Sequence, residues 1–87
     1  MKVFRSDPIP HVTSGYVAFP SPILHAGMKG NEIYAWFMRD ERNDVYNLYT
    51  KAAYVQTGED LPEGAEYFRT VVDDTGYVYH VVIWQNI

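Results

Sequence analysis

The chain has 87 residues, of which 47% are hydrophobic and 16% aromatic, and its formal net charge at pH 7 is −4. At this length folding buries only about 60–65% of the surface that the unfolded chain exposes, so a single domain over residues 1–87 is expected and a second core is excluded. The absence of cysteine excludes a disulfide framework, a thiolate metal site and a catalytic thiol, and an excess of 11 acidic over 7 basic residues argues against a nucleic-acid partner.

The N-terminal part is punctuated by proline and glycine. Pro8 and Pro10 predict an irregular lead-in over residues 1–11, and β-branched and aromatic residues then predict a strand over 12–19. Glycines predict a turn within 26–31. No apolar run near the N-terminus is long enough for a signal peptide or a membrane span, so we expect a cytoplasmic protein without a membrane partner.

Residues 32–38 alternate as a strand does. Ile33, Ala35 and Phe37 share one face of an extended chain, and the other face is also apolar and carries Trp36. A strand that is apolar on both faces is typical of the centre of a sheet, so we expect this strand to be covered on both sides.

Residues 45–56 fit two kinds of secondary structure. A helix over 44–57 would be capped by Asn43 and ended by Gly58, and helical spacing gathers five residues on one face: Val45, Leu48, Tyr49, Ala52 and Val55. The same segment is rich in valine, tyrosine and threonine, which favour strands, although its alternation is poor.

The last third predicts a β-hairpin. Two β-rich runs, 67–72 and 77–84, flank Asp73-Asp74-Thr75-Gly76, a four-residue loop in which the glycine accepts a positive φ. Along the second run, one face is shared by four residues: Tyr77, Tyr79, Val81 and Ile83.

Two stretches together resemble a loosely defined group of small bacteriophage-type β-domains. The residues that carry the resemblance are Gln56-Thr57-Gly58, then Leu61-Pro62-Glu63-Gly64-Ala65-Glu66-Tyr67, then Thr70-Val71, and finally 76–81 with the pair Tyr79-His80. The resemblance covers roughly the last third of the chain and departs from the pattern at Gln56, where the group has glycine. It implies no activity, but it implies a viral origin, hence the cytoplasm of a host cell, and it places 45–56 on a strand.

We therefore expect an all-β fold, a single small antiparallel sheet or open barrel built from a meander of about 4–6 strands. An α+β fold with one helix at 44–57 is the alternative.

No catalytic or ligand-binding motif stands out. The three histidines, His11, His25 and His80, are too far apart for a local metal motif, and the adjacent acids Asp73-Asp74 fall in a turn, where aspartate is favoured for its own backbone bonding. Phosphate-binding, dinucleotide-binding and nucleophile-elbow motifs are missing from the sequence. We expect a non-enzymatic protein without a metal or cofactor, in which neighbours on a sheet face satisfy the ring nitrogens of His80.

Tyrosine and acid are the features that point to binding. The eight tyrosines are too many for a small core to bury with every hydroxyl paired, and residues 44–87 sum to a charge of −5 against +1 for residues 1–43. Aromatic side chains are enriched at interface hot spots. The predicted binding surface combines aromatic residues with acids of the loops: Tyr46, Tyr49, Tyr54, Tyr77, Tyr79, Trp36, Glu59, Asp60 and Glu63.

The sequence thus predicts a protein-binding module, an accessory or inhibitor protein of bacteriophage type that engages a host or viral protein through this acidic aromatic surface. Two alternatives stay open. Trp36 and its aromatic neighbours are suited to stacking a nucleotide or a sugar. Edge strands near 81–84 are suited to pairing between chains, which would make a homo-oligomer, either structural or a virion accessory.

Overall fold

The computed structural model describes residues 1–40 and 48–85. These residues form seven strands and one short 3₁₀ turn, η1: β1 Lys2–Arg5, η1 Val12–Ser14, β2 Val17–Pro20, β3 Ile23–Lys29, β4 Glu32–Arg39, β5 Tyr49–Val55, β6 Glu66–Val72 and β7 Val78–Gln85. The predicted all-β class is confirmed. Within the same residues, no helix is long and apolar enough to span a membrane.

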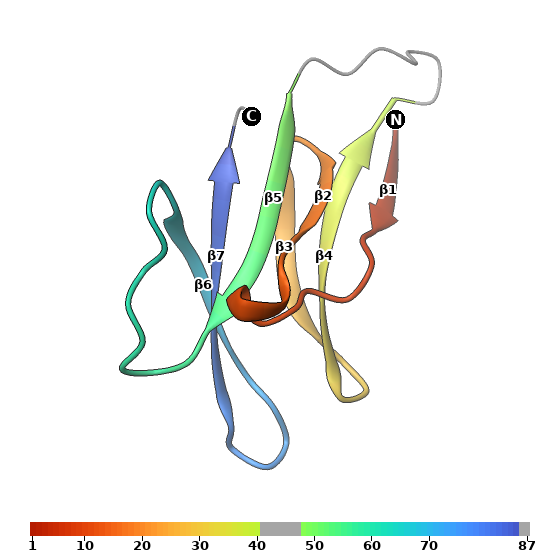
Figure 1. The fold of residues 1–87 in the computed structure, drawn as a ribbon. Coiled ribbons are helices and arrows are strands. Elements are labelled where there is room, and N and C mark those ends of the chain that lie inside the picture. Colours follow the sequence, from red (N-terminus) through yellow and green to blue (C-terminus); the bar gives the residue numbers. More distant parts are fainter. Residues whose placement is uncertain (41–47, 86–87) are drawn as a thin grey trace.

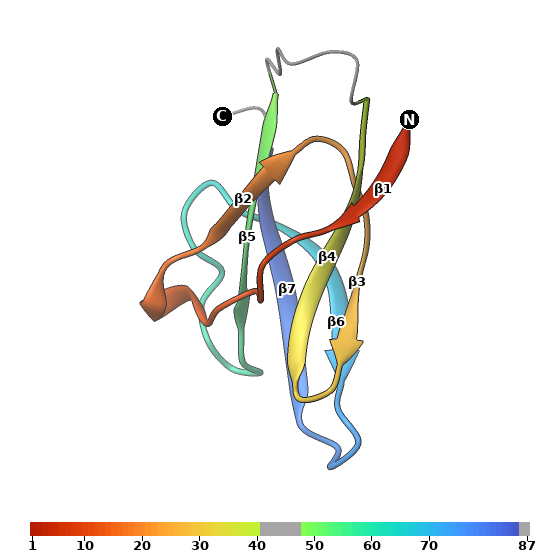
Figure 2. The same ribbon diagram turned by 90° about the vertical axis from the view of Figure 1, so that its right-hand side faces the viewer.

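The strands form two antiparallel sheets instead of the single sheet expected (Figures 1 and 2). A three-stranded sheet has the order β1-β4-β3, and a four-stranded sheet has the order β2-β5-β7-β6. The two sheets do not close into a barrel. The predicted number of strands, about 4–6 in one meander, was too small, because the described residues form seven. The chain changes sheet between β1 and β2, again between β2 and β3 and a third time between β4 and β5.

The hydrophobic core lies between the inner faces of the two sheets. From β4 it takes Ile33, Ala35 and Phe37, the face that alternation predicted, and opposite them lie side chains of the four-stranded sheet. All ten core residues are at most 8% exposed: Ile9, Phe19, Ala26, Ile33, Ala35, Phe37, Ala52, Val71, Val81 and Ile83. The expected central position of this strand is confirmed, because β4 lies between β1 and β3. Among residues 1–40 and 48–85 no strand lies against its other face, so the expectation that both faces are covered was wrong.

The segment with two possible structures is a strand where the structure describes it. β5 pairs with β2 on one side and with β7 on the other, so the alternative of a helix over 44–57 is wrong for Tyr49–Val55, while residues 41–47 lie outside the described part. Ala52 on its inner face and Ala53 on its outer face are both fully buried. Burial on both faces removes the alternation that would have marked a strand.

The N-terminal segment is more regular than predicted. β1 lies inside the expected irregular lead-in 1–11, and the chain then follows β4, because Ser6 N–H donates to the Ala35 carbonyl at 2.8 Å and Ile9 N–H to the Ile33 carbonyl at 2.8 Å. The expected strand 12–19 is extended only in β2, and most of the expected turn 26–31 belongs to β3.

The predicted C-terminal hairpin is confirmed, with β6 and β7 joined by a loop in which Gly76 has φ 88°. β7 has a partner strand on each side, however, so residues 81–84 are not an edge and cannot pair with another chain as predicted. The strands at the sheet edges are β1, β3, β2 and β6.

The loop between β5 and β6, residues 56–65, folds against the outer face of the four-stranded sheet. Trp84 Nε1 donates to the Glu63 carbonyl at 3.0 Å, and Gly64, with φ 79°, lies against the indole ring. This contact holds the second half of the loop near the start of β5, because Trp84 pairs with Lys51. The first half of the loop follows the end of β5, where the candidate site is found.

Candidate functional site

Four rings from separate parts of the chain contact one another in series. His11 precedes η1 and meets Tyr54 of β5 edge to face at 5.3 Å between centroids, and Tyr54 meets Tyr79 of β7 at 5.0 Å. Tyr77, just before β7, lies 5.0 Å from Tyr79. We call His11, Tyr54, Tyr77 and Tyr79 the aromatic cluster. Its members span 68 positions in sequence, and only the fold brings them together.

A backbone contact accounts for the position of His11. Tyr54 N–H donates to the Pro10 carbonyl at 2.9 Å, and an isolated parallel bridge pairs His11 with Tyr54. The imidazole Nδ1 accepts from the Thr13 N–H at 3.2 Å, which caps η1. The ring is therefore fixed by both its backbone and one of its nitrogens.

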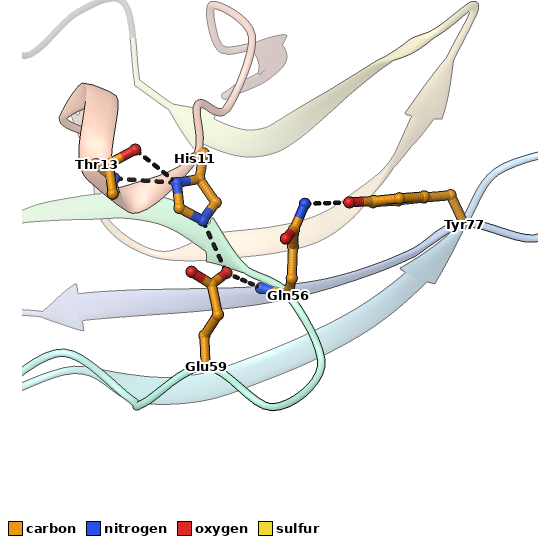
Figure 3. A network of polar contacts seen from close by, with 5 residues as sticks. All are labelled: His11, Thr13, Gln56, Glu59 and Tyr77. Carbon is orange, nitrogen blue, oxygen red and sulfur yellow. Dashed lines mark hydrogen bonds and ion pairs between the residues drawn. The ribbon is translucent and has the colours of Figure 1, made fainter.

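The second nitrogen of His11 reaches the acidic loop (Figure 3). Nε2 lies 2.8 Å from Oε1 of Glu59, and the same oxygen accepts from Gln56 N–H at 2.6 Å. The hydrogen bond from His11, followed by that from Gln56, holds the pKa of Glu59 below its ordinary value. Gln56 Nε2 also donates to the Tyr77 hydroxyl, so the loop is tied to both ends of the aromatic cluster.

A second carboxylate organises the other side of the aromatic cluster. Asp73 Oδ1 accepts from Thr75 Oγ1 at 2.7 Å and from the backbone N–H groups of Thr75 and Tyr77 at 2.9 Å each. Its Oδ2 accepts from the Tyr79 hydroxyl at 3.1 Å. These bonds, that of the Thr75 hydroxyl first, lower the pKa of Asp73. Burial, and then the bond to this carboxylate, raises the pKa of Tyr79.

This arrangement predicts an acid-sensitive loop. Because the pKa of Asp73 is lower in the folded chain than its ordinary value of 3.8, its carboxylate stabilises the fold above that value, and the stabilisation is lost as the pH falls through the lowered pKa. Asp73→Asn is therefore expected to be less stable than the parent at pH 7, with the difference closing in acid. Urea unfolding at a series of pH values from 7 to about 2 measures it.

Asp74→Asn is the matched control, since it removes the same charge from the neighbouring loop position. It should follow the parent across the whole pH range. A difference between Asp73→Asn and the parent that stays constant down to the lowest pH would contradict the role of the carboxylate.

A cavity of about 380 Å³ opens between the two sheets beside the aromatic cluster. Its wall is formed by the proline-rich segment with η1, by the start of β4, by the end of β5 and by the start of β7. The lining residues are Pro8, Ile9, Pro10, His11, Ser14, Asn31, Glu32, Ile33, Tyr54 and Tyr79. A second hollow of about 310 Å³ is lined by Tyr77 and its neighbours and includes Gln56 and Thr57. The aromatic cluster thus borders two concave surfaces.

The predicted binding residues divide into three groups. Tyr54, Tyr77, Tyr79 and Glu59 come together at the aromatic cluster. Asp60 and Glu63 are exposed in the same β5–β6 loop, without a described side-chain bond to the cluster. The rest lie elsewhere: Tyr49 at the far end of β5, Trp36 on the outer face of the other sheet, and Tyr46 outside the described residues.

His11 is the member of the site that the sequence did not indicate. It lies in a segment expected to be irregular, and its partners are 43 positions away at Tyr54 and 48 at Glu59. No local spacing signals such a contact. The only hint is the pair Pro8 and Pro10, which keeps the preceding backbone extended.

His80 belongs to a separate network on the outer face of the four-stranded sheet. Its Nε2 lies 2.8 Å from Thr57 Oγ1 and its Nδ1 lies 3.0 Å from Thr70 Oγ1, which in turn lies 2.8 Å from the Tyr67 hydroxyl. The expectation that neighbours satisfy both ring nitrogens is confirmed. Thr57, Thr70 and His80 thus join the β5–β6 loop to the hairpin.

Carboxylates and imidazoles gather nowhere in residues 1–40 and 48–85 in a group of three suited to a metal ion. No protein-family model, curated protein or solved structure matches the chain.

Proposed function

We propose that this chain is a non-enzymatic protein-binding module that holds an arginine- or lysine-bearing extended segment of its partner at the aromatic cluster. One observation carries the proposal: four contacting rings border two hollows, and an oriented carboxylate stands at their edge.

The rings suit a cation. An arginine or lysine head group within about 6 Å of a tyrosine face is attracted by the ring quadrupole, by about 0.5–1 kcal/mol at an exposed site. Tyr77 is 46% exposed, and Tyr54 and Tyr79 line the larger cavity. The cavity volume lies within the range of about 300–1,000 Å³ that is usual for ligand sites, so a partner side chain can enter it.

The carboxylate is positioned to meet the same cation. Both internal hydrogen bonds of Glu59 use Oε1, so within the described residues Oε2 has no bond and faces away from His11 and Gln56 (Figure 3). Glu32 lines the cavity, and its nearest base along the hairpin is Lys29, its pairing partner. Asp60 and Glu63 add negative charge in the β5–β6 loop. Acids thus outnumber bases around the cluster. This negative charge should speed the association of a basic segment and fix its orientation.

The resemblance of the last third to bacteriophage-type β-domains supports a host or viral protein as the partner, with inhibition or accessory assembly as the consequence. Such a role needs binding alone, which a site built from rings and carboxylates can supply.

A peptide titration tests the proposal. Addition of a peptide that alternates arginine with proline to the ¹⁵N-labelled protein should shift the amide signals of His11, Tyr54, Glu59 and Tyr79. Tyr77→Ala should weaken binding about two- to fivefold through loss of one ring face. Glu59→Gln should weaken it by a similar factor through loss of one carboxylate.

Glu66→Gln is the matched control, because it removes one acid from β6, outside the aromatic cluster, and should leave the affinity unchanged. Equal binding of a peptide that alternates glutamate with proline would contradict the proposal. So would shifts confined to residues outside the cluster.

A further inference from the structure

A row of three rings with an arginine at each end crosses the outer face of the three-stranded sheet. The guanidinium of Arg5 lies 4.3 Å above the ring of Tyr34, which lies 6.4 Å from Trp36. Trp36 lies 5.7 Å from His25, and Arg69 Nη1 donates to Nδ1 of His25 at 2.8 Å. We call these five residues the cationic row.

The row spans both sheets, because Arg69 comes from β6, the edge strand that lies beside β3 (Figure 2). Gly27 makes room for it: a Cβ there would stand 3.0 Å from Nε2 of His25, so the glycine allows the imidazole to lie close to the strand next to Trp36. The side chains of this face are therefore packed against one another and preoriented.

The core does not account for these aromatic residues. The inner face of β4 fills the core, whereas Tyr34 and Trp36 are only half-buried, by neighbours on their own face. Further along this face, Val3 is 59% and Met38 37% exposed. An aromatic and apolar sheet face without a covering layer marks a binding surface more often than a structural one.

The charge of this face is opposite to that of the whole chain. By alternation along the strands, Arg5 of β1, Lys29 of β3 and Glu32 of β4 lie on this outer face, whereas Lys2 and Arg39 lie on the other face with Phe4 and Phe37. The acid, Glu32, lies beside the row, where its Oε1 accepts from the Tyr34 hydroxyl at 3.4 Å. Arg69 adds a further cation at the end of the row opposite to Arg5. The net charge of −4 therefore hides a positive face, since most acids lie in the connections of the other half.

We propose that the cationic row binds single-stranded nucleic acid. Aromatic rings stack on unpaired bases, and neighbouring arginine side chains neutralise phosphates. Single-strand binders that tolerate many sequences combine these two contacts. In a duplex the base faces are hidden, so a duplex can contact the row only through its phosphate charges. A mononucleotide needs a concave site that buries most of its surface, whereas this row is an open sheet face that runs from β1 to β6.

The direct test is fluorescence anisotropy of a labelled oligothymidylate of about 12 nucleotides. The intact chain should bind it at low ionic strength, more tightly than thymidine monophosphate or a duplex of the same length. Arg5→Ala and Arg69→Ala should each lower the slope of log affinity against log salt by about 0.7, the value for one phosphate contact on a single strand. Trp36→Leu should weaken binding about fivefold or more through loss of a stacked base.

Lys51→Ala is the matched control, since it removes one cation from the four-stranded sheet, where the ammonium lies 4.5 Å from the Tyr16 ring. It should leave the salt slope unchanged, as should Glu59→Gln at the aromatic cluster. In Trp84→Phe, where Trp36 is the remaining tryptophan, the oligonucleotide should quench the fluorescence.

Absence of binding at low salt would overturn the proposal without affecting the proposed peptide site. Equal binding of the duplex or the mononucleotide would overturn the single-strand assignment. Equal competition by polyglutamate would replace it with a general affinity for anions, and an equal effect of Lys51→Ala would remove the row as the site.

Discussion

Phe37→Ala is expected to lower the free energy of unfolding by about 3–5 kcal/mol. Phe37 is 8% exposed, and its ring is stacked with Phe19 at 5.2 Å and with Phe4 at 6.1 Å. The three rings come from β4, β2 and β1. Truncation of Phe37 therefore leaves a space next to Phe4 in its own sheet and next to Phe19 in the opposite sheet. The backbone of each strand is held by its own ladder, and the space cannot close. A domain of this size has about 5–15 kcal/mol of stability in total, so the variant should approach unfolding.

Met38→Ala is the matched control for this prediction, because it truncates the next residue of the same strand on the opposite face. Met38 is 37% exposed, and its loss should cost less than about 1 kcal/mol. Urea unfolding at pH 7, followed by far-UV circular dichroism, measures both variants. Equal losses would contradict the assignment of faces on β4 and with it the two-layer arrangement.

The parts of the fold that the sequence predicts best are those with local signals. In the hairpin of β6 and β7, a loop of turn-forming residues separates two β-rich runs, and the alternation of Tyr79, Val81 and Ile83 identifies the inner face. The division into two sheets has no such signal. It depends on β2 and β3 joining different sheets across a short connection, which no periodicity records.

β5 shows why pattern fails for some strands. Its inner face packs in the core through Ala52, and Ala53 on its outer face is equally buried. The sequence is therefore apolar at consecutive positions, which fits a helix as well as a strand. The pairing with β2 and β7 decides the structure, and pairing is a tertiary property.

The candidate site was predictable in composition and only partly in position. An excess of tyrosine indicated exposed rings, and three of the predicted tyrosines contact one another in series, while Glu59 joins the same cluster through His11. Tyr49 and Tyr54 were predicted for one surface, but they occupy the two ends of β5. The positive face of the three-stranded sheet was hidden by averaging, since net charge sums over residues that the fold separates.

Trp84→Ala is expected to lower the free energy of unfolding by about 3 kcal/mol and to weaken peptide binding at the aromatic cluster. The indole packs against Gly64 and donates to the Glu63 carbonyl at 3.0 Å. It therefore holds the β5–β6 loop, which carries Glu59. Without the ring, the loop is held mainly by the His80–Thr57 and His11–Glu59 contacts, and the carboxylate loses its fixed position. Hydrogen exchange of residues 56–65 should accelerate more than that of β7.

Trp84→Phe separates packing from hydrogen bonding. Phenylalanine keeps most of the ring against Gly64 and loses one N–H donor, which should cost about 1 kcal/mol and leave peptide affinity close to that of the parent. If Trp84→Ala unfolds the chain, the hydrogen-exchange comparison is made on Trp84→Phe, where a smaller acceleration confined to the loop is expected. Unchanged exchange in both variants would mean that the loop is held without Trp84. The position of the Glu59 carboxylate would then be set by its 2.8 Å contact with His11 and by the N–H of Gln56.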